Sequence, residues 1–102
     1  MMLTNKEFHE TINDKEGAFI LFSAVWCQPC KALTRVIASN GLHLQGPFYK
    51  IDIDTHRDIA NEYKIKAVPT IIYFADGKEV KRAVGNLNLT KLQDLMESVK
   101  ND

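Results

Sequence analysis

The sequence has few cysteines, no long hydrophobic run and no excess of either charge. Two cysteines among 102 residues exclude a small domain held together by several disulfides. No apolar run approaches the roughly 18 residues that a membrane-spanning helix needs, so no membrane partner is expected. Thirteen basic side chains balance thirteen acidic ones, so we expect no nucleic-acid partner either. Any partner must therefore be recognised through local shape and local charge.

The length and the first residues bear on domain organisation and compartment. A chain of 102 residues suits one core, so we expect a single domain over residues 1–102. Residues 1–3 lack the charged, apolar and small-residue segments of a signal peptide. We therefore expect a cytoplasmic protein. In that reducing compartment a lone pair of cysteines is more often catalytic or metal-binding than structural.

Hydrophobic periodicity and capping signals predict alternating helices and strands. Thr4 and Glu7 form a capping box that predicts a helix over 5–14. Residues 18–24 are apolar without alternation, which is typical of a central parallel strand covered on both faces. The other expected elements are a short strand at 1–3, a helix from the cysteines to Ser39, strands at 49–54, 71–74 and 80–84, a short helix capped by Thr55 with Asp58, and a last helix capped by Asn88.

This alternation predicts an α/β sandwich with a sheet between two layers of helices. Crossover helices favour parallel strands, while Asp76-Gly77 predicts a hairpin that adds an antiparallel edge. A mixed sheet follows.

Both cysteines lie in the segment Trp26-Cys27-Gln28-Pro29-Cys30-Lys31, where an expected strand meets an expected helix. Cys27 would face unpaired N–H groups and the positive end of the helix dipole, which favour its thiolate. Lys31 adds a nearby cation, and we expect the Cys27 sulfur to be open to solvent. Cys30 lies one turn along the same face, so a reversible disulfide is geometrically natural. Pro29 costs little in a first helical turn.

Metal binding is the alternative use of two thiolates. His43 follows Cys30 at a spacing that suits a zinc finger, but His56 lies too far beyond it to complete a site within one chain. Two chains that share a metal through four thiolates stay an open alternative. We expect no metal.

The cysteine segment resembles the active-site signature of the thioredoxin family. Val68-Pro69-Thr70 resembles the family's cis-proline loop, Asp76-Gly77-Lys78 its hairpin turn, and Val84-Gly85-Asn86 its substrate-facing glycine loop. The motifs come in the family's order and the similarity runs from about Leu3 to Val99. The resemblance implies a thioredoxin fold of about five strands in the order 1-3-2-4-5, flanked by four helices.

The resemblance also implies the reaction. The family reduces protein disulfides: Cys27 would attack as the nucleophile and Cys30 would resolve the mixed disulfide, leaving a Cys27–Cys30 disulfide. No metal or organic cofactor is needed for that exchange. The implied partners are disulfide-containing proteins and a thioredoxin reductase, and we expect a monomer.

A docking surface beside the cysteines is implied in the same way. The backbone of Val68 would pair with an incoming peptide as a strand does, and Trp26 would form a flat surface for the partner. Without the resemblance, the sequence would favour a trans peptide bond before Pro69, because most X–Pro bonds are trans. The resemblance implies a cis bond, because the matching family proline is cis. The implied substrate-binding residues are Trp26, Gln28, Pro29, Val68, Pro69, Gly85 and Asn86.

The chain departs from the family pattern at two positions. Leu21 stands where a buried aspartate usually lies behind the second cysteine, so the resolving step is expected to lack its usual base. Lys50 matches the lysine that accompanies that aspartate and has lost this partner, or simply lies on a solvated strand face. Gln28 replaces a glycine and is expected to change the reduction potential.

Two other functions stay open from the sequence. The docking surface could serve a protein partner independently of redox chemistry, a role that would survive conversion of Cys27 and Cys30 to serine. An oxidant or isomerase of the same fold is the other alternative. Pro29 disfavours it by resemblance, because those relatives usually have histidine there.

Overall fold

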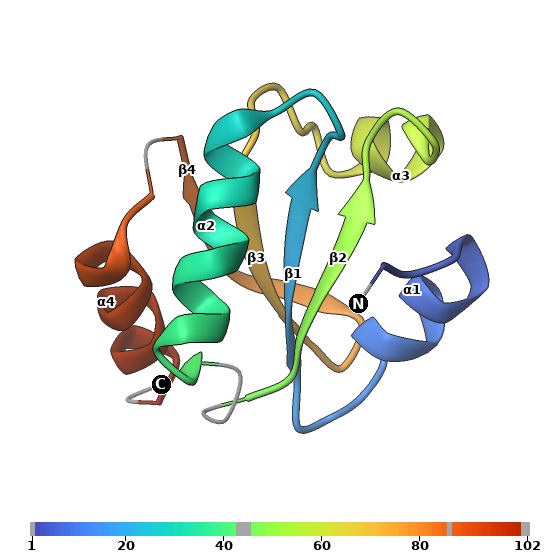
Figure 1. Cartoon of the computed structure of the whole chain (residues 1–102). Coiled ribbons are helices and arrows are strands. Elements are labelled where there is room, and N and C mark those ends of the chain that lie inside the picture. Colours follow the sequence, from blue (N-terminus) through green and yellow to red (C-terminus); the bar gives the residue numbers. More distant parts are fainter. Residues whose placement is uncertain (1, 43–45, 86, 101–102) are drawn as a thin grey trace.

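The computed structural model describes residues 2–42, 46–85 and 87–100. Within these ranges, four α-helices and four strands follow one another in the order α1-β1-α2-β2-α3-β3-β4-α4 (Figure 1). No helix in this part of the chain is long and apolar enough to cross a membrane. The elements are α1 (Asn5–Ile12), β1 (Ala18–Ser23), α2 (Gln28–Ser39), β2 (Phe48–Asp52), α3 (Arg57–Glu62), β3 (Thr70–Ala75), β4 (Lys78–Val84) and α4 (Leu89–Lys100).

The sheet is mixed, with the strand order β2-β1-β3-β4. β1 is parallel to β2 but antiparallel to β3, so the predicted mixed sheet is confirmed and its antiparallel part extends beyond the hairpin to β1. β3 and β4 are antiparallel and joined by the expected hairpin, where Asp76 (φ 56°) and Gly77 (φ 79°) both adopt the left-handed conformation of a tight turn.

The expected first strand is only a bridge. Met2 makes one parallel bridge to Lys50 at the edge of β2, so the sheet of the described residues has four strands instead of five. Three residues before the N-cap of α1 are too few for a ladder. The position of the bridge beside β2 nevertheless agrees with the expected order 1-3-2-4-5, and the expected mixed α/β sandwich is confirmed.

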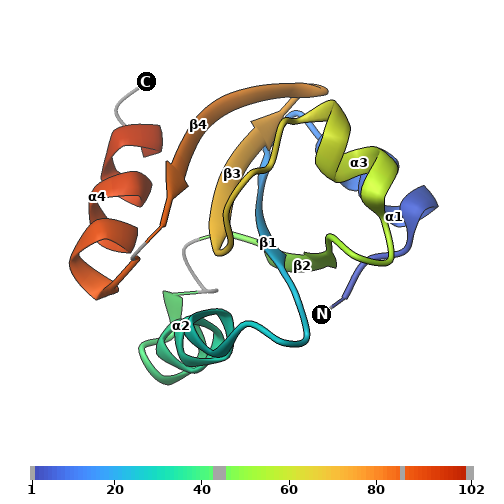
Figure 2. The ribbon, with the colours of Figure 1, turned by 90° about the horizontal axis from the view of Figure 1, so that it is seen from above.

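Helices cover both faces of the sheet. Seen from above, α1 and α3 lie on one side, and α2 and α4 lie on the other (Figure 2). Alternate β1 side chains serve the two cores: Ile20 and Phe22 pack with Phe8 of α1, whereas Phe19 and Leu21 pack on the α2 and α4 side. All six β1 residues are buried, which confirms a central strand covered on both faces.

The helix caps explain where the helices begin. The Thr4 hydroxyl accepts a hydrogen bond from the Glu7 N–H (3.1 Å), and the Glu7 carboxylate accepts one from the Thr4 N–H (2.9 Å). The predicted capping box is therefore confirmed, and its backbone hydrogen bond lowers the pKa of Glu7. Asn88 caps α4 as expected, because its side-chain oxygen accepts a hydrogen bond from the Lys91 N–H (3.0 Å).

The cap predicted for α3 is wrong. This helix begins after His56, which makes no side-chain capping bond. The Asp58 carboxylate accepts instead a hydrogen bond from the Asn5 side chain of α1 (2.9 Å), which lowers the pKa of Asp58. α1 and α3 lie on the same face of the sheet (Figure 2). The Asp58 carboxylate, which the sequence pattern placed in a cap, therefore binds a residue of the neighbouring helix instead.

Candidate active site

The two cysteines lie where β1 ends and α2 begins. Cys27 is the N-cap residue of α2, and its sulfur accepts a hydrogen bond from the Cys30 N–H (3.1 Å). Pro29 lies in the first helical turn, as expected. The carbonyl of Cys27 accepts a hydrogen bond from the Lys31 N–H (3.3 Å), which continues the helix. A sulfur in this position receives a backbone N–H and the positive end of the helix dipole.

The two sulfurs are bonded to each other, and their Cα atoms are 5.3 Å apart. Cys27 is 3% exposed and Cys30 is 2% exposed, so the expectation of an open Cys27 is wrong for this oxidised form. Both pack in a small cluster with Ala24, against which Ile53 and Val68 lie. Position on the helix, not burial, distinguishes the two sulfurs.

The proline loop lies against the disulfide. The Val68–Pro69 peptide bond is cis, as the resemblance implied. Pro69 is buried, and its carbonyl accepts a hydrogen bond from the Gly85 N–H (3.0 Å). Gly85 has φ of 92°, which an L side chain rarely adopts, and the space beside its Cα is open. This hydrogen bond joins the proline and glycine loops, and Val68 connects them to the cysteines.

Trp26 is an exposed side chain with a specific anchor. It is 63% exposed, and its indole N–H donates a hydrogen bond to the Asp54 carboxylate (2.8 Å). The Asp54 N–H in turn donates to the Asp52 side chain (2.8 Å). The sequence analysis did not predict that Asp54 binds Trp26. The position of Asp54 just after a strand that is parallel to β1 could have indicated this contact. Carboxyl ends of parallel neighbours meet at one edge of a sheet, where Trp26 also lies.

The comparisons with known proteins decide the family. The family model described as Thioredoxin matches residues 1–98. The chain belongs to the thioredoxin family. Thioredoxin from Mycoplasma genitalium is 35% identical over 94 residues, covering 91% of this chain and 92% of that protein. Thioredoxin-1 from Saccharomyces cerevisiae is 36% identical over 83 residues, covering 80% and 81%.

A solved structure gives the same result. The crystal structure of Malassezia sympodialis thioredoxin superimposes with a TM-score of 0.84 at 30% identity, over 95% of this chain and 87% of that one. This thioredoxin-family protein is a thiol–disulfide oxidoreductase with protein-disulfide reductase activity. The family acts on disulfide-containing substrates.

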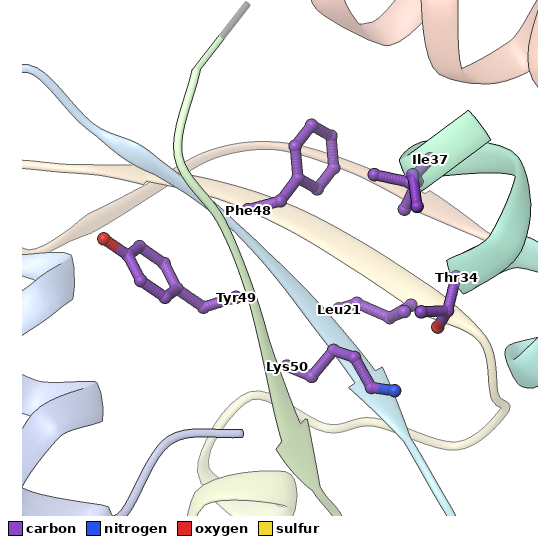
Figure 3. Close-up of a pocket in the computed structure, with 7 residues that line it drawn as sticks. Leu21, Thr34, Ile37, Phe48, Tyr49 and Lys50 are labelled. Atoms are coloured by element: carbon purple, nitrogen blue, oxygen red, sulfur yellow. The ribbon is translucent and has the colours of Figure 1, made fainter. Parts of the chain in front are cut away.

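Position 21, where the chain departs from the family pattern, is a buried apolar side chain. Leu21 is 1% exposed and packs with Leu33 and Ile37 of α2. It lies opposite Lys50 in the β1–β2 register. Figure 3 shows the Lys50 side chain beside those of Leu21 and Thr34. These three side chains are among those that line a cavity of about 180 Å³. Lys50 is half-buried and has no ion pair with another described residue.

The remaining predicted site residues lie at the surface or outside the described ranges. Gln28, Pro29 and Lys31 are exposed on the first turn of α2. Asn86 and His43 lie outside the described residues. Among the residues that the structure describes, no three His, Cys, Asp or Glu side chains gather into a group that could hold a metal ion.

Proposed function

We propose that Cys27 is the nucleophile and Cys30 the resolving thiol in the reduction of protein disulfides. The observation that carries this assignment is the N-cap position of Cys27, whose sulfur receives the Cys30 N–H at 3.1 Å. In the reduced protein the same N–H and the helix dipole stabilise a Cys27 thiolate, the form that attacks disulfides. Cys30 is one turn further in, close enough to bond to Cys27.

The reaction consists of two exchanges. The Cys27 thiolate attacks one substrate sulfur, a Cys27–substrate bond forms, the substrate disulfide breaks, and the released substrate thiolate takes a proton. The Cys30 thiol then loses its proton and attacks the Cys27 sulfur, which forms the Cys27–Cys30 bond and releases the second substrate thiol. The substrate gains two electrons and the protein loses them.

The partner docks on the loops around the disulfide. Val68 packs against the cysteine cluster and is half-buried, which leaves its backbone for strand-like pairing with a substrate segment. Trp26 offers an exposed ring held by Asp54. The full set that we assign to substrate binding is Trp26, Gln28, Pro29, Val68, Pro69, Gly85 and Asn86.

Four residues modulate the exchange in this proposal. Leu21 supplies no carboxylate behind Cys30, so the resolving step is slower near neutral pH than with a buried base. Lys31 and Lys50 place positive charge near the cysteines. Gln28, which lies between the two cysteines in the sequence, alters the reduction potential.

The wider setting follows the family. We assign residues 1–102 to one cytoplasmic, monomeric domain whose dithiol is restored by a thioredoxin reductase. The match of the family model to residues 1–98 supports one domain, and a lone cysteine pair suits a reducing compartment. The exchange uses no cofactor on this chain.

Insulin reduction tests the proposal. The protein is expected to accelerate insulin precipitation with dithiothreitol as reductant, and also with a thioredoxin reductase and its nicotinamide cofactor. Protein alkylated at both thiols before the assay is the matched control and is expected to be inactive. If the protein is active with dithiothreitol but inactive with the reductase, the assignment of a thioredoxin reductase as its partner is wrong. If it is inactive with both reductants, the proposed function is wrong.

A further inference from the structure

A second cavity lies on the Cys30 side of the active site. Its volume is about 400 Å³, and Cys30, Lys31 and Lys50 border it together with Ser23, Val25 and Met2. We call it the Cys30-side cavity. It is separate from the loops around Val68, Pro69 and Gly85 to which we assign the docking of the substrate backbone.

The charge around this cavity has one sign. Lys31 comes from the first turn of α2 and Lys50 from β2, and no acidic side chain of the described residues borders the cavity. Neither lysine forms an ion pair with a described residue. The residue opposite Lys50 in the parallel register is Leu21, which offers no carboxylate. Two cations therefore border one cavity without a counter-charge from the part of the chain that the structure describes, although the net charge of the chain is zero.

The rim of the cavity is apolar and continues toward Trp26. Val25 is 70% exposed and Met2 is 47% exposed. Val25 is the neighbour of Trp26, which is itself 63% exposed. A chain segment that covers Trp26 can therefore reach Val25 and the two lysines.

We propose that the Cys30-side cavity binds a carboxylate side chain of the substrate polypeptide, a glutamate or aspartate within a few residues of the attacked cystine. This inference rests on the proposed function, since the substrate must first dock at Cys27. A solvent-exposed ion pair is too weak to hold a free carboxylate by itself. A side chain tethered by docking has a high effective concentration, so the same contacts become a preference among substrates.

The test is a set of disulfide peptides that differ by one side chain. A glutamate, or the isosteric glutamine, is placed one to three residues on either side of the attacked cysteine, and kcat/KM is measured at low ionic strength. The ratio of glutamate to glutamine substrate is the readout, because any effect of a lysine on the thiols themselves cancels in it. At the best position we expect a ratio of about threefold to tenfold, from one or two ion pairs.

Two variants and one salt series complete the experiment. K31Q/K50Q is expected to bring the ratio close to one, while K6Q/K15Q, which removes the same charge from α1 and the turn after it, keeps the ratio of the unmodified protein. Salt at 0.5 M is also expected to reduce the ratio, because exposed ion pairs are screened. This series needs no variant.

The outcomes separate the two proposals. A ratio near one at every position, or a ratio that K31Q/K50Q and salt leave unchanged, overturns the cavity assignment while reduction of the glutamine peptides still supports the proposed function. Failure to reduce any peptide overturns the proposed function itself.

Discussion

Replacing Cys30 with serine is expected to leave the protein covalently attached to its substrate, whereas replacing Cys27 with serine should form no adduct. In the first variant the Cys27 thiolate still receives the N–H of residue 30 and the helix dipole, so attack proceeds. No second thiol is present to displace the substrate. In the second variant the remaining thiol lies inside the first turn of α2, away from the cap position.

Mass spectrometry of both variants after incubation with a disulfide peptide measures this difference. We expect a stoichiometric mixed disulfide for Cys30→Ser, little or none for Cys27→Ser, and loss of essentially all insulin reduction in both. The hydroxyl is close in size to the thiol, so serine serves as its own steric control. An adduct that forms on Cys27→Ser and not on Cys30→Ser would reverse the assigned order of attack.

Leu21→Asp is expected to lower stability and to accelerate the resolving step. Leu21 is 1% exposed, and truncating such a leucine costs about 2–5 kcal/mol. Burial of a new polar group without a partner adds roughly 1–3 kcal/mol. We therefore expect a loss of about 3–8 kcal/mol near neutral pH, a large part of the roughly 5–15 kcal/mol that stabilises a small domain.

The stability loss should depend on pH in a definite direction. Burial raises the pKa of the new carboxyl above its value in the unfolded chain. The loss is therefore smallest below about pH 4, where the carboxyl is protonated in both states, and grows as the pH rises through the folded-state pKa. Leu21→Asn is the matched control, with the same size and no titration. Urea unfolding at pH 4 and pH 8 measures the difference, and identical pH dependence for the two variants would contradict it.

The same two variants test whether the lack of a carboxylate at position 21 slows the resolving step. A carboxylate at position 21 can accept the proton of Cys30, so single-turnover release of substrate should be faster in Leu21→Asp than in the unmodified protein, and not in Leu21→Asn. The sole tryptophan, Trp26, lies next to Cys27 and provides the fluorescence signal. Equal release rates at every pH would show that Leu21 does not limit the resolving step.

Local signals in the sequence predicted the parts of the fold that local interactions determine. Thr4, Glu7 and Asn88 each cap a helix through bonds within three residues, and the uninterrupted apolar run of β1 reflects burial on both faces. The Thr55 cap failed because Asn5, far away in the sequence, binds the Asp58 carboxylate. The antiparallel pairing of β1 with β3 also lay beyond the local signals, since it depends on the arrangement of the whole sheet.

The active site divides in the same way. The N-cap position of Cys27 followed from a strand-to-helix junction with a proline in the first turn. The Trp26–Asp54 hydrogen bond joins a residue after β2 to a residue after β1, and the Cys30-side cavity joins Lys50 of β2 to residues after β1. Periodicity shows that each strand exists but not which side chains meet at its end. The burial of Cys27 was also missed, because Val68 and Ile53 cover the sulfurs from other segments.

The most direct test of the central claim is the pH dependence of alkylation of the reduced protein, with the modified cysteine identified by mass spectrometry. The account predicts that iodoacetamide modifies Cys27 first, with an apparent pKa below that of an ordinary thiol, while Cys30 reacts slowly over the same range. Modification of Cys30 before Cys27, or a Cys27 that ionises no more readily than an ordinary thiol, would contradict it.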